Sequence, residues 1–207
     1  MNKALLILVV LGLGSGVQVR AEHCSYALDP SSVQVNWTAF KTMQRLAVNG
    51  SFTEVSIFGE LQDPGSFTHL LSQLEGEIGV KDATLIRTGN PGRDMTLFQH
   101  FFSRFKKTPV LSAAIQDVRG DEKSGEFALS LKMNRKSKPV LMHYQRSDSG
   151  VFEARGSLDV LDFGLSDALQ DLHKTCEVLH RGPDGVSKTW PLVELKLVAR
   201  IGQTCKP

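Results

Sequence analysis

The chain has 207 residues, of which 41% are hydrophobic and 22% charged, a composition that fits one or at most two globular domains. Its formal charge is only +2 and no long basic stripe follows any segment, so a nucleic-acid-binding role is not expected. After residue 21 no segment approaches ~18 uninterrupted apolar residues, so we expect a soluble mature chain without stable membrane insertion.

Residues 1–21 have the pattern of a cleaved secretory signal peptide. Lys3 provides the positive start, Ala4–Leu13 the apolar run, and Val19-Arg20-Ala21 a small-x-small cleavage site. Cleavage there would leave 22 basic and 22 acidic residues, because Lys3 and Arg20 are the only charges removed. The sequence therefore predicts a periplasmic or secreted protein with one domain over residues 22–207.

The first half of the mature chain mixes strands with short helices. Val33, Val35, Trp37 and Ala39 alternate with polar residues and predict a strand, and Ser66 is a candidate N-cap. In chain order the pattern predicts strands over 33–39 and 52–58, a helix over 67–74, a strand over 83–87 and a Phe-rich helix over 93–105.

The second half alternates more regularly. It predicts strands over 110–118, 127–133, 140–145 and 151–160, a helix over 166–180 and a last strand over 192–201. Turn sequences separate the strands, which is typical of an antiparallel sandwich or barrel. About eight strands favour a mainly β fold, a closed antiparallel eight-stranded barrel with two or three short α-helices, because closure removes sheet edges.

The Phe-rich helix carries Phe98, Phe101, Phe102 and Phe105 at i, i+3, i+4 and i+7, the spacing of one helical face. This face would cover the barrel. Two interpretations stay open: the rings pack the core, or some of them line a ligand cavity.

Three cysteines remain after residue 21: Cys24, Cys176 and Cys205. One disulfide and one free thiol is the simplest arrangement for an exported chain. Barrel closure would favour Cys24–Cys205, while Cys24–Cys176 would link the second long helix to the first strand, and the sequence does not decide between the pairings. His173, Cys176 and His180 also share one side of a helix, so a metal or thiol site is a further, less favoured interpretation.

The order of several short motifs resembles the YceI-like family of exported bacterial proteins. Arg93-Asp94-x-x-Leu97, followed by Phe101-Phe102, is the strongest match, with Thr96 where many members have His. Further matching segments are Cys24-Ser25-Tyr26-Ala27-Leu28-Asp29-Pro30, Val35-Asn36-Trp37-Thr38-Ala39-Phe40-Lys41-Thr42, Val48-Asn49-Gly50-Ser51-Phe52, Pro109-Val110, Lys138-Pro139-Val140 and Asp162-Phe163-Gly164-Leu165.

The resemblance implies a lipocalin-like barrel that holds a long-chain isoprenoid or similar amphiphile. We expect no enzyme activity and no cofactor, because no nucleophile elbow, phosphate loop or carboxylate pair is present. Arg93 and Arg87 are the candidates for contact with a lipid head group, because they flank the turn before the Phe-rich helix, unless Arg93 and Asp94 only pair with each other or cap the helix. The expected ligand-binding residues are Trp37, Phe52, Arg93, Phe98, Phe101, Phe102, Phe127, Leu129, Leu131, Met142, Tyr144, Phe152 and Ala154.

An alternative is an interaction protein whose barrel is filled by its own side chains. Ala39, Ala154 and Gly156 are small residues on otherwise apolar faces, which favours a hollow interior, although tapering cores also mix large and small residues. The sequence leaves open whether the protein forms a homodimer.

Overall fold

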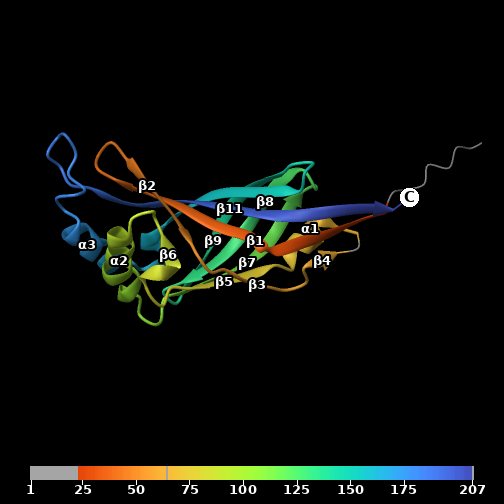
Figure 1. Ribbon diagram of the computed structural model, residues 1–207, viewed down its shortest axis with the longest axis horizontal. Helices are drawn as coiled ribbons and strands as arrows, with labels where there is room; N and C mark the ends of the chain where they lie inside the picture. Colours follow the sequence, from red (N-terminus) through yellow and green to blue (C-terminus); the bar gives the residue numbers. More distant parts are fainter. Residues whose placement is uncertain (1–22, 64, 207) are drawn as a thin grey trace, which may run out of the picture.

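A computed structural model describes residues 23–63 and 65–206 (Figure 1), so the predicted signal peptide lies outside the described residues. The elements are β1 (His23–Lys41), β2 (Leu46–Phe52), β3 (Ser56–Phe58), β4 (Gln62–Asp63), α1 (Phe67–Ser72), β5 (Glu75–Gly79), η1 (Ala83–Leu85), β6 (Ile86–Arg87), α2 (Pro91–His100), η2 (Phe102–Arg104), β7 (Val110–Gly120), β8 (Ser124–Met133), β9 (Lys136–Arg146), β10 (Val151–Asp159), η3 (Val160–Phe163), α3 (Ser166–Thr175) and β11 (Thr189–Lys206). Within these described ranges no helix combines the length and apolarity needed to span a membrane.

The strands form one curled antiparallel sheet in the order β3-β5-β7-β8-β9-β10-β11-β1-β2-β6, with β4 added beside β1. The sheet is an open half-barrel, so the prediction of a closed eight-stranded barrel is wrong in strand number and in closure. Its two end strands are very short, three residues in β3 and two in β6. Such short edges offer little backbone for unwanted pairing, so the sheet limits its edge problem without closing.

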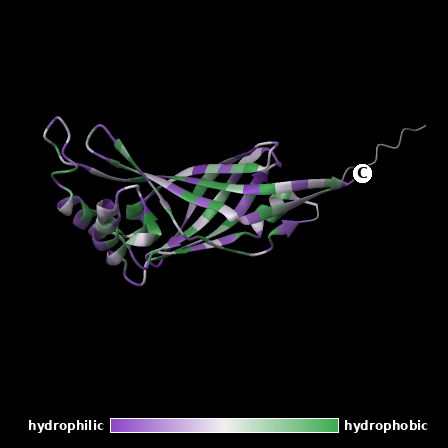
Figure 2. Ribbon diagram, viewed as in Figure 1, coloured by the Kyte–Doolittle hydropathy of each residue, from purple (hydrophilic) through white to green (hydrophobic). Residues whose placement is uncertain are grey.

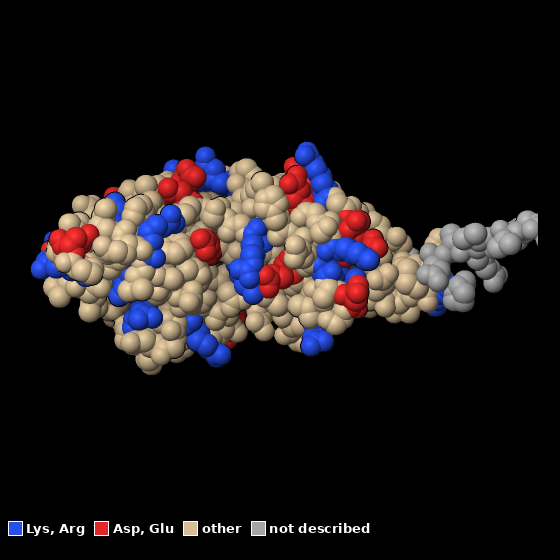
Figure 3. Space-filling model, turned by 90° about the horizontal axis from the view of Figure 1, so that it is seen from above, with Lys and Arg blue, Asp and Glu red and all other residues tan. Residues whose placement is uncertain are grey.

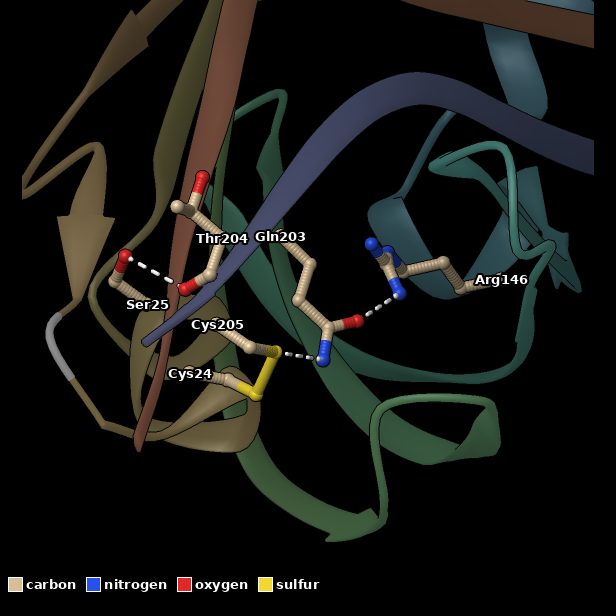
Figure 4. The surroundings of a disulfide bond; sticks show 6 residues. All are labelled: Cys24, Ser25, Arg146, Gln203, Thr204 and Cys205. Atoms are coloured by element: carbon tan, nitrogen blue, oxygen red, sulfur yellow. Dashed lines mark hydrogen bonds between the residues drawn. A yellow bond between two sulfur atoms is a disulfide. The ribbon is translucent and has the colours of Figure 1, made fainter. Parts of the chain in front are cut away.

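The two longest strands, β1 and β11, run side by side along the whole molecule (Figure 1). Their pairing extends from His23 opposite Lys206 to Lys41 opposite Thr189. The disulfide Cys24–Cys205 closes the outer end of this ribbon (Figure 4), which is the pairing that strand geometry favoured. Cys176 is left as a free, buried cysteine.

Most predicted elements are confirmed, and the errors lie where strands are short. The predicted strand 52–58 is broken into β2 and β3, and the predicted strand 83–87 is mostly the 3-10 helix η1. Strand β5 was not predicted, because its sequence EGEIG is charged and rich in glycine, a composition with low strand propensity. The strand is held in the sheet by pairing with β3 and β7. The predicted helix 166–180 ends at Thr175. Ser66 caps α1 as predicted, its hydroxyl accepting from the backbone N–H of His69.

Apolar and polar residues alternate along the strands (Figure 2) and direct one face inward. At the disulfide end the interior is filled by packed rings. The Tyr144 ring lies 5.5 Å from Phe152 and 6.1 Å from Phe127, and Phe67 of α1 lies 5.4 Å from Tyr26, measured between centroids. Helices α2 and α3 cover the opposite end of the sheet (Figure 1).

Candidate functional site

An elongated cavity of about 250 Å³ lies inside the half-barrel, between the sheet and helices α1, α2 and α3. Along β11 its lining extends from Thr189 to Ile201, which is roughly 40 Å at the usual rise of a strand. Its walls are almost entirely apolar. A long, narrow, apolar space suits a chain-like ligand better than a compact polar one.

The walls of the cavity follow from the inward alternation of the long strands. β1 contributes Val33, Val35, Trp37 and Ala39, and this is why residues two apart recur in the lining. The other strands contribute Leu111, Ala113 and Ile115 of β7, Leu129, Leu131 and Met133 of β8, and Val193, Leu195 and Leu197 of β11.

The Phe-rich segment provides part of the roof, but not as one helix. α2 ends at His100, Phe101 is its C-cap, and Phe102 begins η2. Phe101 and Phe102 line the cavity together with Leu97, and the Phe101 and Phe102 rings meet edge to face at 5.3 Å. Phe98 and Phe105 lie outside the lining. All four rings belong to the core or pack against it, so core packing applies to all of them, and ligand contact by Phe101 and Phe102 stays a prediction.

One salt bridge and one hydrogen bond fix η2 and α2 to α3 above the cavity. Asp171 of α3 accepts from Arg104 Nε at 2.7 Å and lies 3.1 Å from His100 Nδ1. Partial burial opposes ionisation of Asp171, but the bonds from His100 and Arg104 outweigh it and hold the pKa of this carboxyl below its usual value. The roof is therefore tied by a charged carboxylate at neutral pH.

The structure separates the expected ligand-binding residues into two groups. Trp37, Phe52, Phe101, Phe102, Leu129, Leu131 and Phe152 line the cavity. Phe98, Phe127, Met142, Tyr144, Ala154 and Arg93 do not, and Phe127, Met142, Tyr144 and Ala154 are instead fully buried at or near the filled end. Phe152 belongs to both regions, because it lines the cavity and packs against the rings of Phe67 and Tyr144.

Arg93 is exposed on the first turn of α2 and does not reach the cavity. Asn90 is the N-cap of this helix, its side chain accepting from the backbone N–H of Arg93. Asp94 accepts from the backbone N–H of Thr88 at 2.9 Å and anchors the helix to the preceding turn. The N-cap is therefore Asn90 and not Arg93 or Asp94, and Asp94 bonds to Thr88 instead of capping the helix.

A small polar group lies at the α3 end of the cavity, which the sequence did not connect with ligand binding. Thr189 lines the cavity, and its hydroxyl lies 2.6 Å from His180 Nδ1 and 3.0 Å from His173 Nδ1. Burial lowers the pKa of His180 to about 4, with the charges of Lys41 and His173 adding to the effect. His180 is therefore neutral at pH 7.

Cys176 lies close to this group but has the properties of a structural cysteine. Burial raises the pKa of its thiol, although the charge of Lys41 acts in the opposite direction. Among residues 23–63 and 65–206 no three His, Cys, Asp or Glu side chains are placed to hold a metal. The structure thus does not assemble His173, Cys176 and His180 into the metal site considered from the sequence.

Much of the cavity wall belongs to β11 and β7, whose lining residues were not among the expected ligand-binding residues. The alternation of Val193, Leu195 and Leu197 was visible in the sequence, and it marks an inward face. Alternation does not distinguish a wall beside empty space from a wall beside packed side chains, so the hollow itself could not be located.

The family model of the YceI-like domain matches residues 26–190 of the chain. The fold is similar to a polyisoprenoid-binding domain from Saccharophagus degradans implicated in plant cell wall breakdown, with a TM-score of 0.58, 12% identity, and coverage of 86% of this chain and 98% of that one. It is also similar to BcnA of Burkholderia cenocepacia (TM-score 0.53, 14% identity, 84% and 99% covered) and to the YCEI protein of Campylobacter jejuni (0.51, 19%, 81% and 90%). Comparison with curated proteins gave no match in sequence.

Proposed function

Because this chain belongs to the YceI-like domain family, we propose that it binds the apolar chain of an isoprenoid or a similar amphiphilic lipid inside its half-barrel. The observation that carries the proposal is the elongated apolar cavity under α2 and α3. The polyisoprenoid-binding domain with the same fold supports it.

The energetics of such a site need no catalytic group. Each buried methylene contributes ~0.8 kcal/mol, so about ten buried carbons would supply ~8 kcal/mol before ordering costs. Association and chain ordering remove several kcal/mol, which leaves binding in the micromolar range for a short tail and tighter binding for a longer one. The cavity is slightly smaller than the ~300–1,000 Å³ of most ligand sites, so it favours a slender chain.

The polar head would lie at the Thr189 end of the cavity, because packed rings block the opposite end. There Thr189, two histidines and Lys41 can donate or accept hydrogen bonds. This placement replaces Arg93, which lies outside the cavity, as the candidate for head-group contact.

We further propose that the protein works outside the cytoplasm as a carrier or a sequestering protein. A disulfide that joins the ends of the described chain is typical of oxidising compartments, and residues 1–21 have the signal-peptide pattern. In that role the cavity would take up a lipid from a membrane or release it to one.

The proposal is tested on protein purified from its own host. Native mass spectrometry and organic extraction should yield a co-purifying prenyl or fatty lipid at about one per chain. After delipidation, isoprenoid alcohols of increasing length should bind with increasing affinity until the chain is long enough to fill the cavity. A folded protein that carries no lipid and takes up none of these alcohols would show that the cavity does not serve lipid binding.

A further inference from the structure

One end of the molecule exposes an unusual share of its apolar side chains. Nine large apolar residues are exposed among those the structure describes. Four of them lie on two neighbouring loops, residues 42–45 and 176–188, and a fifth, Leu46, is the first residue of β2 directly after the first loop. We call these five residues the loop surface: Met43, Leu46, Val178, Leu179 and Val186. Val178 and Leu179 are 77% and 70% exposed, more than the apolar residues exposed elsewhere.

The two loops form one surface because backbone and side-chain bonds hold them together. The backbone N–H of Thr42 donates to the carbonyl of Lys188 at 2.9 Å, and Trp190 Nε1 donates to the carbonyl of Thr42 at 2.7 Å. Lys41 Nζ donates to the carbonyl of Leu179 at 3.1 Å. Both loops project at the α3 end of the molecule (Figure 1), away from the disulfide.

The loop surface is set among positive charges. Residues 41–46 and 174–190 contain five Lys and Arg and two Asp and Glu, a balance of +3 on two short segments of a chain whose total is +2. One of the acidic residues, Glu177, is already paired with Arg181 at 3.2 Å. Elsewhere charges of both signs are dispersed, as one face shows in Figure 3.

The loop surface is also continuous with the cavity. Trp190 lines the cavity, and its ring carries Arg45 at 5.3 Å and Lys188 at 5.2 Å from its centroid. An indole flanked by cations and exposed aliphatic side chains is the composition that proteins place at the membrane–water interface.

We propose that the loop surface docks on an anionic lipid bilayer, with Val178 and Leu179 inserted among the acyl chains and the basic residues on the head groups. Apolar insertion and attraction to anionic lipids act together at such surfaces, and neither requires a membrane-spanning segment. Docking would bring the Thr189 end of the cavity to the bilayer. The inference goes beyond lipid binding and does not require that the cavity be occupied.

Vesicle co-sedimentation tests the proposal with the full mature chain. The protein should bind vesicles that contain phosphatidylglycerol at least tenfold more tightly than vesicles of phosphatidylcholine alone, and high salt should weaken this binding. The double variant Val178→Ser with Leu179→Ser should lower the affinity at least tenfold, because each inserted side chain is worth about a factor of ten.

The matched control replaces two apolar residues of similar character elsewhere, Leu141→Ser with Phe58→Ser, whose side chains are 55% and 52% exposed. This variant should bind vesicles like the unchanged protein. The proposal is overturned if the unchanged protein ignores anionic vesicles, or if the control and the loop variant lose binding equally.

The two proposals fail separately. If the delipidated protein takes up no isoprenoid but still binds anionic vesicles through the loops, the cavity proposal falls and the docking proposal stands. If the delipidated protein takes up isoprenoid from detergent but the Val178→Ser and Leu179→Ser variant binds vesicles as the unchanged protein does, the docking proposal is wrong and the cavity proposal stands.

Discussion

Replacing Ala113 by Leu adds three carbons to a residue of β7 whose side chain lines the cavity. Three methylene equivalents buried in empty space are worth up to ~2.4 kcal/mol, and cavity-filling changes usually deliver about 0.5–2 kcal/mol of that. We therefore expect the free energy of unfolding of the lipid-free variant to be about 1–2 kcal/mol higher than that of the unchanged protein. For a chain of this size the melting temperature should rise by about 5 °C. The same three carbons compete with the ligand, so isoprenoid affinity should fall by at least tenfold.

The control is Ala154→Leu, the same chemical change at a residue that is completely buried and outside the cavity lining. Here the added carbons meet packed neighbours, and overpacking should cost about 1–3 kcal/mol. Thermal unfolding of both delipidated variants, followed by circular dichroism, compares the signs directly. If Ala113→Leu destabilises the protein as much as Ala154→Leu does, the interior is solid at that point and the reasoning from the cavity is wrong.

Three further predictions concern the frame of the cavity. Replacing both disulfide cysteines by Ser should lower the melting temperature by about 10–20 °C, since a bond spanning 181 residues is worth up to about 5 kcal/mol by loop-entropy arguments; calorimetry measures it. His180 has a folded pKa of about 4, below its unfolded value near 6.5, so its contribution is complete above pH 6.5 and is lost as the pH falls toward 4. Between pH 7 and 5 the loss amounts to about 2 kcal/mol of unfolding free energy. In urea titrations repeated at several pH values, His180→Gln should make the unfolding free energy depend less on pH. Gly50→Ala should cost about 1–3 kcal/mol in the same titration, because its Cβ would lie 2.1 Å from Trp37 Cζ2, whereas Gly79→Ala, with open space around it, should cost far less.

The long strands could be predicted from the sequence because each has enough inward residues to show a period of two. Phe127, Leu129, Leu131 and Met133 alternate over the length of β8, and all four are buried. Strand β6 has only two residues, too few to show an alternation of apolar and polar side chains. Its pairing with β2 depends on the curvature of the rest of the sheet. Whether the barrel closes depends on whether the two short end strands, β3 and β6, pair with each other. Because such short strands have no readable pattern, closure was predicted wrongly.

The candidate site was predictable in composition but not in position. Inward apolar residues were recognised on β1 and β8, and seven of the residues selected for ligand binding do line the cavity. The sequence could not show that Tyr144 and Met142 are buried in the packed part of the interior, while Leu131 and Ala113 line the cavity. That difference depends on the packing of α1 at one end and of α2 and α3 at the other, which are contacts distant in sequence.

Phe152 lies where the packed part of the interior meets the cavity, and we propose that this position limits the length of ligand chain that the cavity can hold. It lines the cavity on one side and contacts Phe67, Phe127 and Tyr144 at 5.5–6.5 Å on the other. A tail that enters from the Thr189 end therefore stops at this ring unless the aromatic group moves. Since moving one ring disturbs three partners, each pair worth about 0.5–1.5 kcal/mol, extending the cavity costs more than the one or two methylenes it would admit. The binding energy of a lengthening chain should accordingly stop rising once the chain reaches Phe152.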